Sequence, residues 1–155
     1  MYEIIRDFAH NATFWAALSA WMLAQFTKLL CNLAASGRPG THWLTSTGGM
    51  PSSHSAMVCS LATSIGWRCG CESPSFGFAV AFAILTMFDA SIVRRAAGTQ
   101  AKLLNEMIDE LFKEHRLSER KVRELLGHTR IEVFFGLIMG ICTAFLVNSV
   151  FDIWM

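Results

Sequence analysis

Residues 133–151 read VFFGLIMGICTAFLVNSVF and contain no charged side chain. A helix needs roughly 20 consecutive apolar residues to cross the hydrocarbon core of a bilayer, so this stretch has the length and composition of a transmembrane helix. Residues 8–27, 55–67 and 73–88 also lack acidic and basic residues. The chain is 53% hydrophobic and 16% charged, whereas soluble domains average about 25% charged residues. The sequence therefore predicts an integral membrane protein.

The uncharged stretches predict a helical bundle with one re-entrant loop. Residues 8–27 and 133–151 are long enough to span, as are residues 73–88 if their helix runs on to residue 93. Residues 55–67 are fewer, and a re-entrant loop before them would let their helix begin inside the membrane, where irregular backbone is tolerated if protein or a wet cavity surrounds it. We expect an all-α integral membrane bundle in a single domain over residues 1–155, with about four spanning helices plus this loop. A soluble bundle with a large apolar core is the alternative.

Basic residues gather in two connections between these helices. Nine of the thirteen lysines and arginines lie between Arg94 and Arg130, and Lys28 and Arg38 lie in the connection after the first helix. The positive-inside rule then places both connections in the cytoplasm and both termini outside. The longer connection has apolar residues at helical spacing, which predicts a cytoplasmic amphipathic helix on the membrane surface, with packing against the bundle as the alternative. These apolar residues are Leu103, Leu104, Met107, Ile108, Leu111 and Phe112.

A polar segment opens the second apolar stretch. It reads STGGMPSSHSA over residues 46–56, so hydroxyl groups and His54 lie where a helix begins. Backbone N–H groups and the Ser52 and Ser53 hydroxyls at a helix N-terminus favour an anion, although such serines are also ordinary helix caps. Under the predicted topology the same membrane face receives further ionisable residues, which near a membrane are usually paired or functional. These are Lys28, Arg38, Asp89, Arg94, Arg95, His128 and Glu132.

The cations of this group match the geometry of a phosphate. The guanidinium groups of Arg38 and of Arg94 or Arg95 have forked donors that fit phosphate oxygens, whereas Lys28 supplies a point charge. Asp89 is expected to neutralise one of the nearby cations. The alternative for the arginine pair is a structural place at the membrane border.

The two histidines of the group fit acid and nucleophile chemistry. His128 and Glu132 are four residues apart and share one face of a helix, so the carboxylate can fix the imidazole tautomer and stabilise its charged form. An imidazole held in this way can act as a nucleophile, and His54 can protonate the leaving oxygen. The simpler interpretation of His128 and Glu132 is a surface pair.

Cysteines and other ligand types predict neither a disulfide framework nor a metal site. The chain has five cysteines, an odd number, and Cys69 and Cys71 are too few to hold zinc by themselves. No cluster of histidines, cysteines and carboxylates has ligand spacing. We therefore expect no metal, no cofactor and no nucleic-acid partner.

Three segments together resemble a known enzyme superfamily. PSSHSA and a later His-x-x-x-Glu resemble the type 2 phosphatidic acid phosphatase superfamily, whose usual signatures are Lys-x6-Arg-Pro, Pro-Ser-Gly-His and Ser-Arg-x5-His-x3-Asp. STGGMPSSHSA, FDASIVRRAAGTQA and LLGHTRIEVFFG are more similar to its divergent branch, often labelled acid phosphatase or vanadium-dependent haloperoxidase-related. The similarity extends from Lys28 to Gly140. It implies His128 as nucleophile, Glu132 as the orienting carboxylate and His54 as general acid.

Several positions depart from the usual signatures. Lys28 and Arg38 are separated by nine residues and not six, and Ser53 replaces the glycine of the second signature. Val122 stands where the third signature has its arginine. That contact would then come from one of two sources, which are Arg123, or Arg94 and Arg95.

The resemblance implies a metal-independent phosphatase that acts on a lipid phosphate monoester or diphosphate at the cytoplasmic face of the cell membrane, through a phosphohistidine intermediate. The alternative is a non-catalytic membrane protein that binds anionic lipid headgroups with the same cations. The pair His54 and His128 favours the enzyme, because headgroup binding requires no acid and nucleophile. A vanadate-dependent haloperoxidase is disfavoured, since nothing in the sequence indicates its cofactor. The expected partners are the bilayer and a phosphorylated lipid, and a homo-oligomer is left open.

Overall fold

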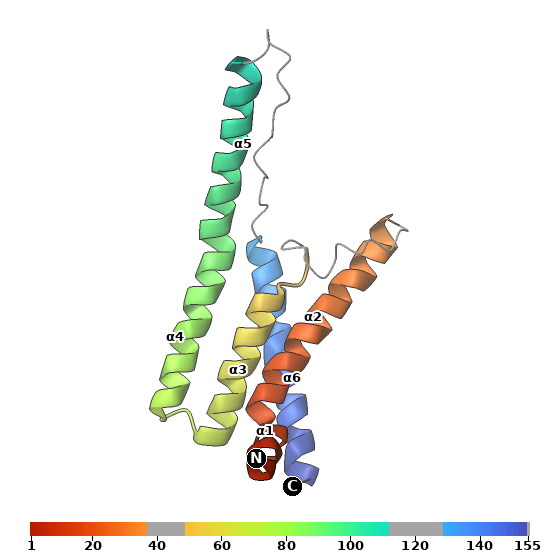
Figure 1. The fold of residues 1–155 in the computed structure, drawn as a ribbon, viewed down its shortest axis with the longest axis vertical. Helices are drawn as coiled ribbons and strands as arrows, with labels where there is room; N and C mark the ends of the chain where they lie inside the picture. Colours follow the sequence, from red (N-terminus) through yellow and green to blue (C-terminus); the bar gives the residue numbers. More distant parts are fainter. Residues whose placement is uncertain (37–48, 112–128, 155) are drawn as a thin grey trace.

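The computed structural model describes residues 1–36, 49–111 and 129–154. These residues form helices and contain no strand, which confirms the predicted all-α fold. The elements in chain order are α1 (Tyr2–Ala9), α2 (Ala12–Ser36), α3 (Ser53–Cys69), α4 (Pro74–Phe88), the π-helix η2 (Asp89–Val93), α5 (Arg94–Leu111) and α6 (Arg130–Trp154) (Figure 1). Both termini lie at one end of the bundle (Figure 1).

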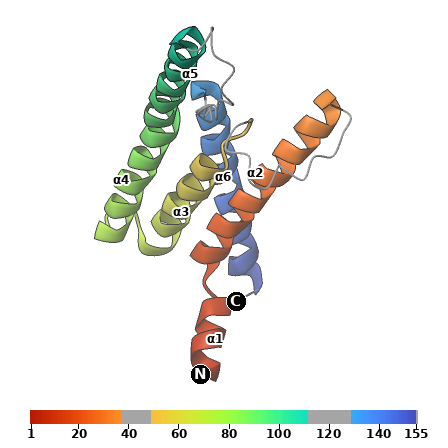
Figure 2. The ribbon, with the colours of Figure 1, turned by 45° about the horizontal axis from the view of Figure 1, so that its top comes forward.

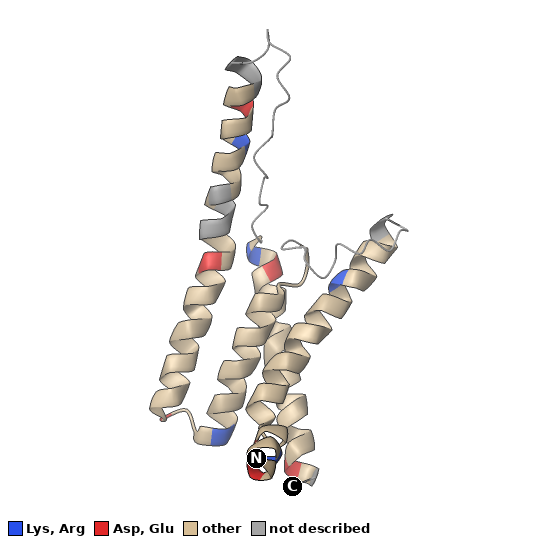
Figure 3. Cartoon of the chain, in the orientation of Figure 1, with Lys and Arg blue, Asp and Glu red and all other residues tan. Residues whose placement is uncertain are grey.

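Three helical segments in the described part of the chain are long and apolar enough to cross a membrane. They are Ala12–Ala34, Pro74–Ile92 and Arg130–Ile153. In Figure 3 the middle of the bundle formed by α2, α3, α4 and α6 is free of charged residues among the residues drawn, whereas α5, which extends past this bundle, has charged residues along its length. This distribution confirms the predicted membrane helical bundle, because a charge in the hydrocarbon core is costly.

The fourth predicted crossing corresponds to α3. Its 17 residues span about 26 Å at 1.5 Å per residue, which is shorter than the roughly 30 Å of a bilayer core. The helix nevertheless occupies the centre of the bundle and contacts α2, α4 and α6 (Figures 1 and 2). Most of the re-entrant loop predicted before α3 falls in residues 37–48 and lies outside the described residues.

Small side chains explain how α3 reaches three neighbours at once. On α2, Ala16, Ala20 and Ala24 recur every fourth residue and are fully buried. On α6, a Cβ atom at Gly136 would collide with the Ser52 carbonyl oxygen, and one at Gly140 would collide with the Ala56 carbonyl oxygen. Helices in a membrane associate largely through such close backbone packing. The α3 backbone is therefore held directly against α6.

A tight turn makes α3 and α4 antiparallel neighbours. Gly70 ends α3 at a φ of 82°, in the left-handed region that favours glycine. Ser73 then caps α4, because its Oγ accepts from the Phe76 N–H at 3.2 Å, and Pro74 occupies the first helical position, where its missing donor costs nothing. The two helices share a small core of Val58, Cys59 and Ala83.

The predicted amphipathic helix exists and continues the direction of α4. Helix α5 covers residues 94–111, so the helical prediction is confirmed for that range, whereas Phe112 lies outside the described residues. Through η2 the chain runs from α4 into α5 as one long rod that extends past the other helices (Figures 1 and 2). No proline or glycine falls between Phe78 and Ala97 to break the helix, and the π turn absorbs an extra residue without stopping it. Its placement on the membrane surface stays a prediction.

Candidate functional site

The site begins where α3 begins. Ser52 caps the helix, and its Oγ accepts from both the N–H and the hydroxyl of Ser55, the latter at 3.0 Å. The Ser52 N–H donates to the Glu132 carbonyl oxygen at 2.9 Å. Ser52, Ser53 and Ser55 are all buried. The first turn of α3 is therefore fixed to the first turn of α6 through main-chain contacts, with its helix dipole directed at this junction.

A buried lysine completes this junction from α2. Lys28 is only 2% exposed, and its Nζ donates to the Ser53 Oγ at 3.3 Å. It lies one turn after Ala24, so it extends the line of small residues that α2 presents to α3. Burying an ammonium group is costly unless hydrogen bonds and opposite charge offset the lost hydration. The Glu132 carboxylate supplies part of that opposite charge, since the two groups interact electrostatically.

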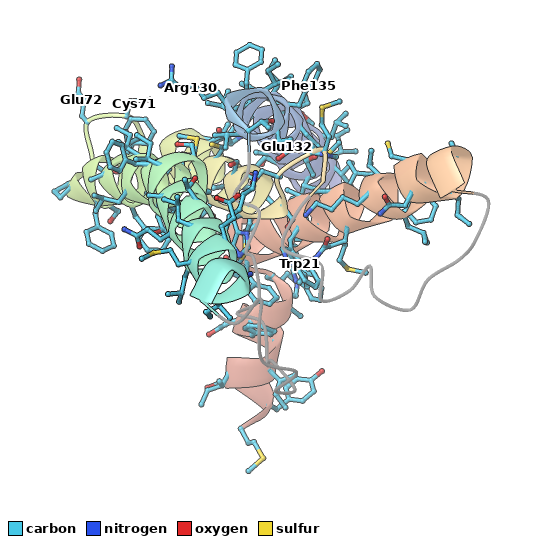
Figure 4. All side chains as sticks on the ribbon, turned by 90° about the horizontal axis from the view of Figure 1, so that it is seen from above. Trp21, Cys71, Glu72, Arg130, Glu132 and Phe135 are labelled. Carbon is cyan, nitrogen blue, oxygen red and sulfur yellow. The ribbon has the colours of Figure 1, made fainter. Side chains whose placement is uncertain are left out.

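Glu132 also forms a capping box at the start of α6. Its Oε2 accepts from the Thr129 N–H at 2.9 Å, and its own N–H donates to the Thr129 Oγ1 at 3.3 Å. Seen from above in Figure 4, Glu132 lies on the side of α6 towards the other helices, whereas Arg130 lies on the outer side. A carboxylate has two acceptor oxygens, so capping leaves it able to contact other groups. Glu132 thus has a structural role beside the one predicted from the sequence.

His54 is the second residue of α3 and is half-buried beside Ser53. Its position in the first helical turn puts the imidazole at the same end of the bundle as Lys28 and Glu132. A histidine at a helix N-terminus lies in the positive part of the helix dipole, a setting that favours a nearby anion. The imidazole can serve such an anion as hydrogen-bond donor or as proton donor.

The structure thus brings five of the predicted residues to one junction of three helices, and their roles stay predictions. These are Lys28, Ser52, Ser53, His54 and Glu132. The predicted residues Arg38 and His128 lie outside the described residues, as do the side chains of Arg94 and Arg95, which begin α5. The π-helix η2 contacts α6, so the element that leads into Arg94 adjoins the helix that bears Glu132.

Two features of the junction were missed in the sequence. The pattern Thr129-x-x-Glu132 is the signature of a capping box, and it predicts a helix start at the residue now seen to begin α6. The pattern Gly136-x-x-x-Gly140 in an apolar stretch indicates close helix packing. Both signals were present in the sequence, and together they position the main chain of Glu132 against Ser52.

Metal-ligand side chains do not cluster in the described part of the chain. Among residues 1–36, 49–111 and 129–154, no group of three or more histidines, cysteines and carboxylates could hold a metal ion. The five cysteines are free thiols, and Cys59 is the buried one. The expectation of metal-independent chemistry stays a prediction.

This architecture defines a class: a helical membrane protein with a polar, cation-containing site at one end of its bundle. A sequence profile of the Divergent PAP2 family matches residues 9–143, and the chain belongs to that family. The chain is also 38% identical to the "Uncharacterized membrane protein YuiD" of Bacillus subtilis (strain 168), with 84% of this chain and 90% of that protein covered. No solved structure matches the chain. The family predicted from the motifs is confirmed.

Proposed function

We propose that this protein is a metal-independent phosphatase that hydrolyses a lipid phosphate monoester or diphosphate at the membrane surface. The observation that carries the proposal is the buried Lys28 ammonium, held against the N-terminus of α3 by the Ser53 hydroxyl. A cation withdrawn from water beside a helix N-terminus is suited to bind an anion such as phosphate. Membership of the Divergent PAP2 family supports a phosphatase relationship.

In the proposed site, phosphate binding uses groups from three helices. The α3 N-terminus and the Ser53 hydroxyl donate hydrogen bonds to phosphate oxygens, and Lys28 neutralises part of their charge. Arg38 and one of Arg94 and Arg95 supply the forked contacts expected from the sequence. With this many cations, the negative charge on the phosphoryl oxygens in the transition state is stabilised without a metal ion.

The proposed chemistry has two steps. A ring nitrogen of His128 attacks phosphorus and forms a P–N bond, the P–O bond to the lipid breaks, and His54 gives its proton to the departing oxygen. Water then attacks phosphorus and gives a proton to His54, the P–N bond breaks and returns its electron pair to the His128 nitrogen, and inorganic phosphate is released. Glu132 stabilises the positive charge that His128 carries in the intermediate.

Phosphate release by the purified protein tests this proposal. The protein is assayed in phosphatidylcholine nanodiscs with phosphatidic acid, an isoprenyl diphosphate and p-nitrophenyl phosphate, each with and without chelator. We expect release from at least one lipid, unchanged by chelator and abolished in His128→Ala. Activity that survives in His128→Ala, or activity lost with chelator and restored by a divalent ion, would contradict the mechanism.

A second candidate is binding of anionic lipid headgroups without turnover. The capping box favours it, because one oxygen of Glu132 already has a structural partner in Thr129. Under this alternative Lys28 and Ser53 hold the headgroup and the histidines only add hydrogen bonds. The same assay separates the two, since this protein would bind lipid phosphate and release no inorganic phosphate.

A further inference from the structure

An apolar groove lies between α2 and α6 beside the proposed phosphate site. Its volume is about 350 Å³. The two helices cross and then diverge towards the C-terminal end of α2 (Figures 1 and 2), and the groove occupies this angle. Its walls include Leu23 and Thr27 of α2, Met50 of the segment before α3, and Phe135, Ile138 and Cys142 of α6.

One end of the groove adjoins the phosphate site. Thr27 immediately precedes Lys28, and Met50 lies two residues before the cap Ser52. Phe135 is next to Gly136, whose main chain packs against the Ser52 carbonyl. A molecule whose phosphate contacts Lys28 and Ser53 therefore has an apolar channel directly beside that phosphate.

The walls of the groove offer carbon and sulfur atoms. Its hydroxyl residues turn their donors to their own helices: the Thr27 Oγ1 donates to the Leu23 carbonyl oxygen at 2.8 Å, and the Thr143 Oγ1 donates to the Met139 carbonyl oxygen at 2.8 Å. The hydroxyl donors of these two threonines are therefore already used within their own helices. Ligand sites with apolar walls and polar groups at one end suit amphipathic molecules.

The groove has the length of one lipid leaflet. Its lining residues on α6 extend from Phe135 to Leu146, and these eleven steps correspond to about 16 Å of helix at 1.5 Å per residue. Half of a bilayer core is about 15 Å. A chain that begins at the level of the phosphate site would therefore end near the midplane of the membrane.

We propose that this groove binds one hydrocarbon chain of the lipid whose phosphate binds at Lys28 and Ser53, an inference that rests on the proposed function. The substrate class is then a membrane-resident lipid phosphate that enters sideways from the leaflet. A soluble phosphate ester would use the polar end of the site alone. Binding of the chain adds affinity in proportion to the apolar area it buries.

Photochemical labelling tests the occupant of the groove. An alkyl phosphate with a diazirine in its chain is irradiated with the protein in phosphatidylcholine nanodiscs, and the adducts are mapped by mass spectrometry. We expect adducts on residues 23–31 and 135–146, reduced by excess unlabelled alkyl phosphate and by Lys28→Gln. Leu85 is 68% exposed on α4 and does not line the groove, so its labelling should not respond to competition.

A second test measures the kinetics of a variant in which a larger side chain fills the groove. Cys142→Trp should raise KM for a long-chain alkyl phosphate by about tenfold or more, the effect of excluding about two methylene groups from an apolar site. It should leave p-nitrophenyl phosphate hydrolysis unchanged, and Leu85→Trp should change neither substrate. Equal effects of Cys142→Trp on both substrates would overturn the proposal that the groove binds a hydrocarbon chain.

The outcomes separate this proposal from the one on which it rests. Competed adducts in the groove without phosphate release support the chain site and contradict the phosphatase. If phosphate is released without chain-length preference, and the adducts are spread uniformly and do not respond to competitor, the phosphatase is supported and the proposal of chain binding in the groove is overturned. A disulfide between two copies through Cys142, formed in native membranes and insensitive to alkyl phosphate, would assign the groove to a second copy of the chain and also overturn the proposal.

Discussion

The two ends of α3 solve the problem of polar groups in a membrane in opposite ways. At the C-terminal end, the Arg68 Nη1 lies 2.8 Å from the Asp152 Oδ1, and the Arg68 Nε donates to the Asn148 Oδ1 at 2.9 Å. The Trp67 Nε1 donates to the Asp152 Oδ2 at 2.9 Å, and the Asn148 Nδ2 donates to the Ser64 Oγ at 2.9 Å. Charges and dipoles there are matched by groups within the protein.

At the N-terminal end, the buried Lys28 amine has a neutral hydroxyl as its hydrogen-bond partner. Lys28 donates to Ser53 at 3.3 Å, and the carboxylate that interacts with it electrostatically, Glu132, also caps α6. Buried charges in a membrane protein usually have a partner or a function. The comparison shows that Arg68 is paired within the protein at one end of α3, whereas the other end is the one that we propose receives an anion.

Among variants at the two ends of α3, the largest effect is expected from removing His54, the proposed general acid at the N-terminal end. His54→Ala should lower hydrolysis of an alkyl phosphate by about 10²- to 10⁴-fold, the usual contribution of general acid catalysis. It should largely spare p-nitrophenyl phosphate, whose leaving group needs no proton. Steady-state rates on the two substrates measure this difference, and equal losses on both would assign His54 to binding instead.

A second prediction concerns the close contact between the N-terminal end of α3 and α6. Gly136→Val should destabilise the bundle by about 1–3 kcal/mol or more, because overpacking forces backbone apart, and here the obstacle is the Ser52 carbonyl oxygen. Gly77→Val is the matched control, since a Cβ there meets nothing within 4 Å. Thermal unfolding in detergent compares the two, and equal melting temperatures would contradict the close packing of α3 and α6.

A smaller effect is expected from the capping box. Thr129→Ala removes the hydroxyl that accepts from the Glu132 N–H and should cost about 1 kcal/mol of stability. Thr129→Ser keeps the hydroxyl and should keep the stability. If neither variant changes the melting temperature while both lower phosphate release, Thr129 acts on the site and not on the helix.

The helices and the family could be predicted from the sequence more completely than the site. Charge-free stretches predict spanning helices because only internally hydrogen-bonded backbone is stable in lipid, and the predicted apolar segments lie in helices apart from His10, Asn11 and Ser73. The motifs around His54 and Glu132 sufficed for the family. The extension of the third apolar stretch towards residue 93 was expected and is seen in the apolar helical segment Pro74–Ile92. The direct continuation from η2 into α5 was not predicted.

Contacts between residues on different helices could not be predicted from the sequence. The burial of Lys28 depends on which helix faces the alanines of α2, and periodicity gives the face but not the neighbour. The pairing of Arg68 with Asp152 joins α3 to the end of α6 for the same reason. Gly136 and Gly140 predict close contact without saying that α3 provides it.

The most direct test exchanges the charge at each end of α3 for a side chain of similar length. Lys28→Met and Arg68→Met are compared for affinity for a long-chain alkyl phosphate and for melting temperature in the same nanodiscs. Lys28→Met should weaken binding by about 10- to 100-fold, the effect of losing a hydrogen bond to a charged group, with an unchanged or higher melting temperature because it removes a buried charge. Arg68→Met should keep the affinity and lower the melting temperature, since Asp152 loses its ion pair and Asn148 loses a hydrogen bond. The opposite pattern, with Lys28→Met unstable and fully able to bind alkyl phosphate, would contradict the account.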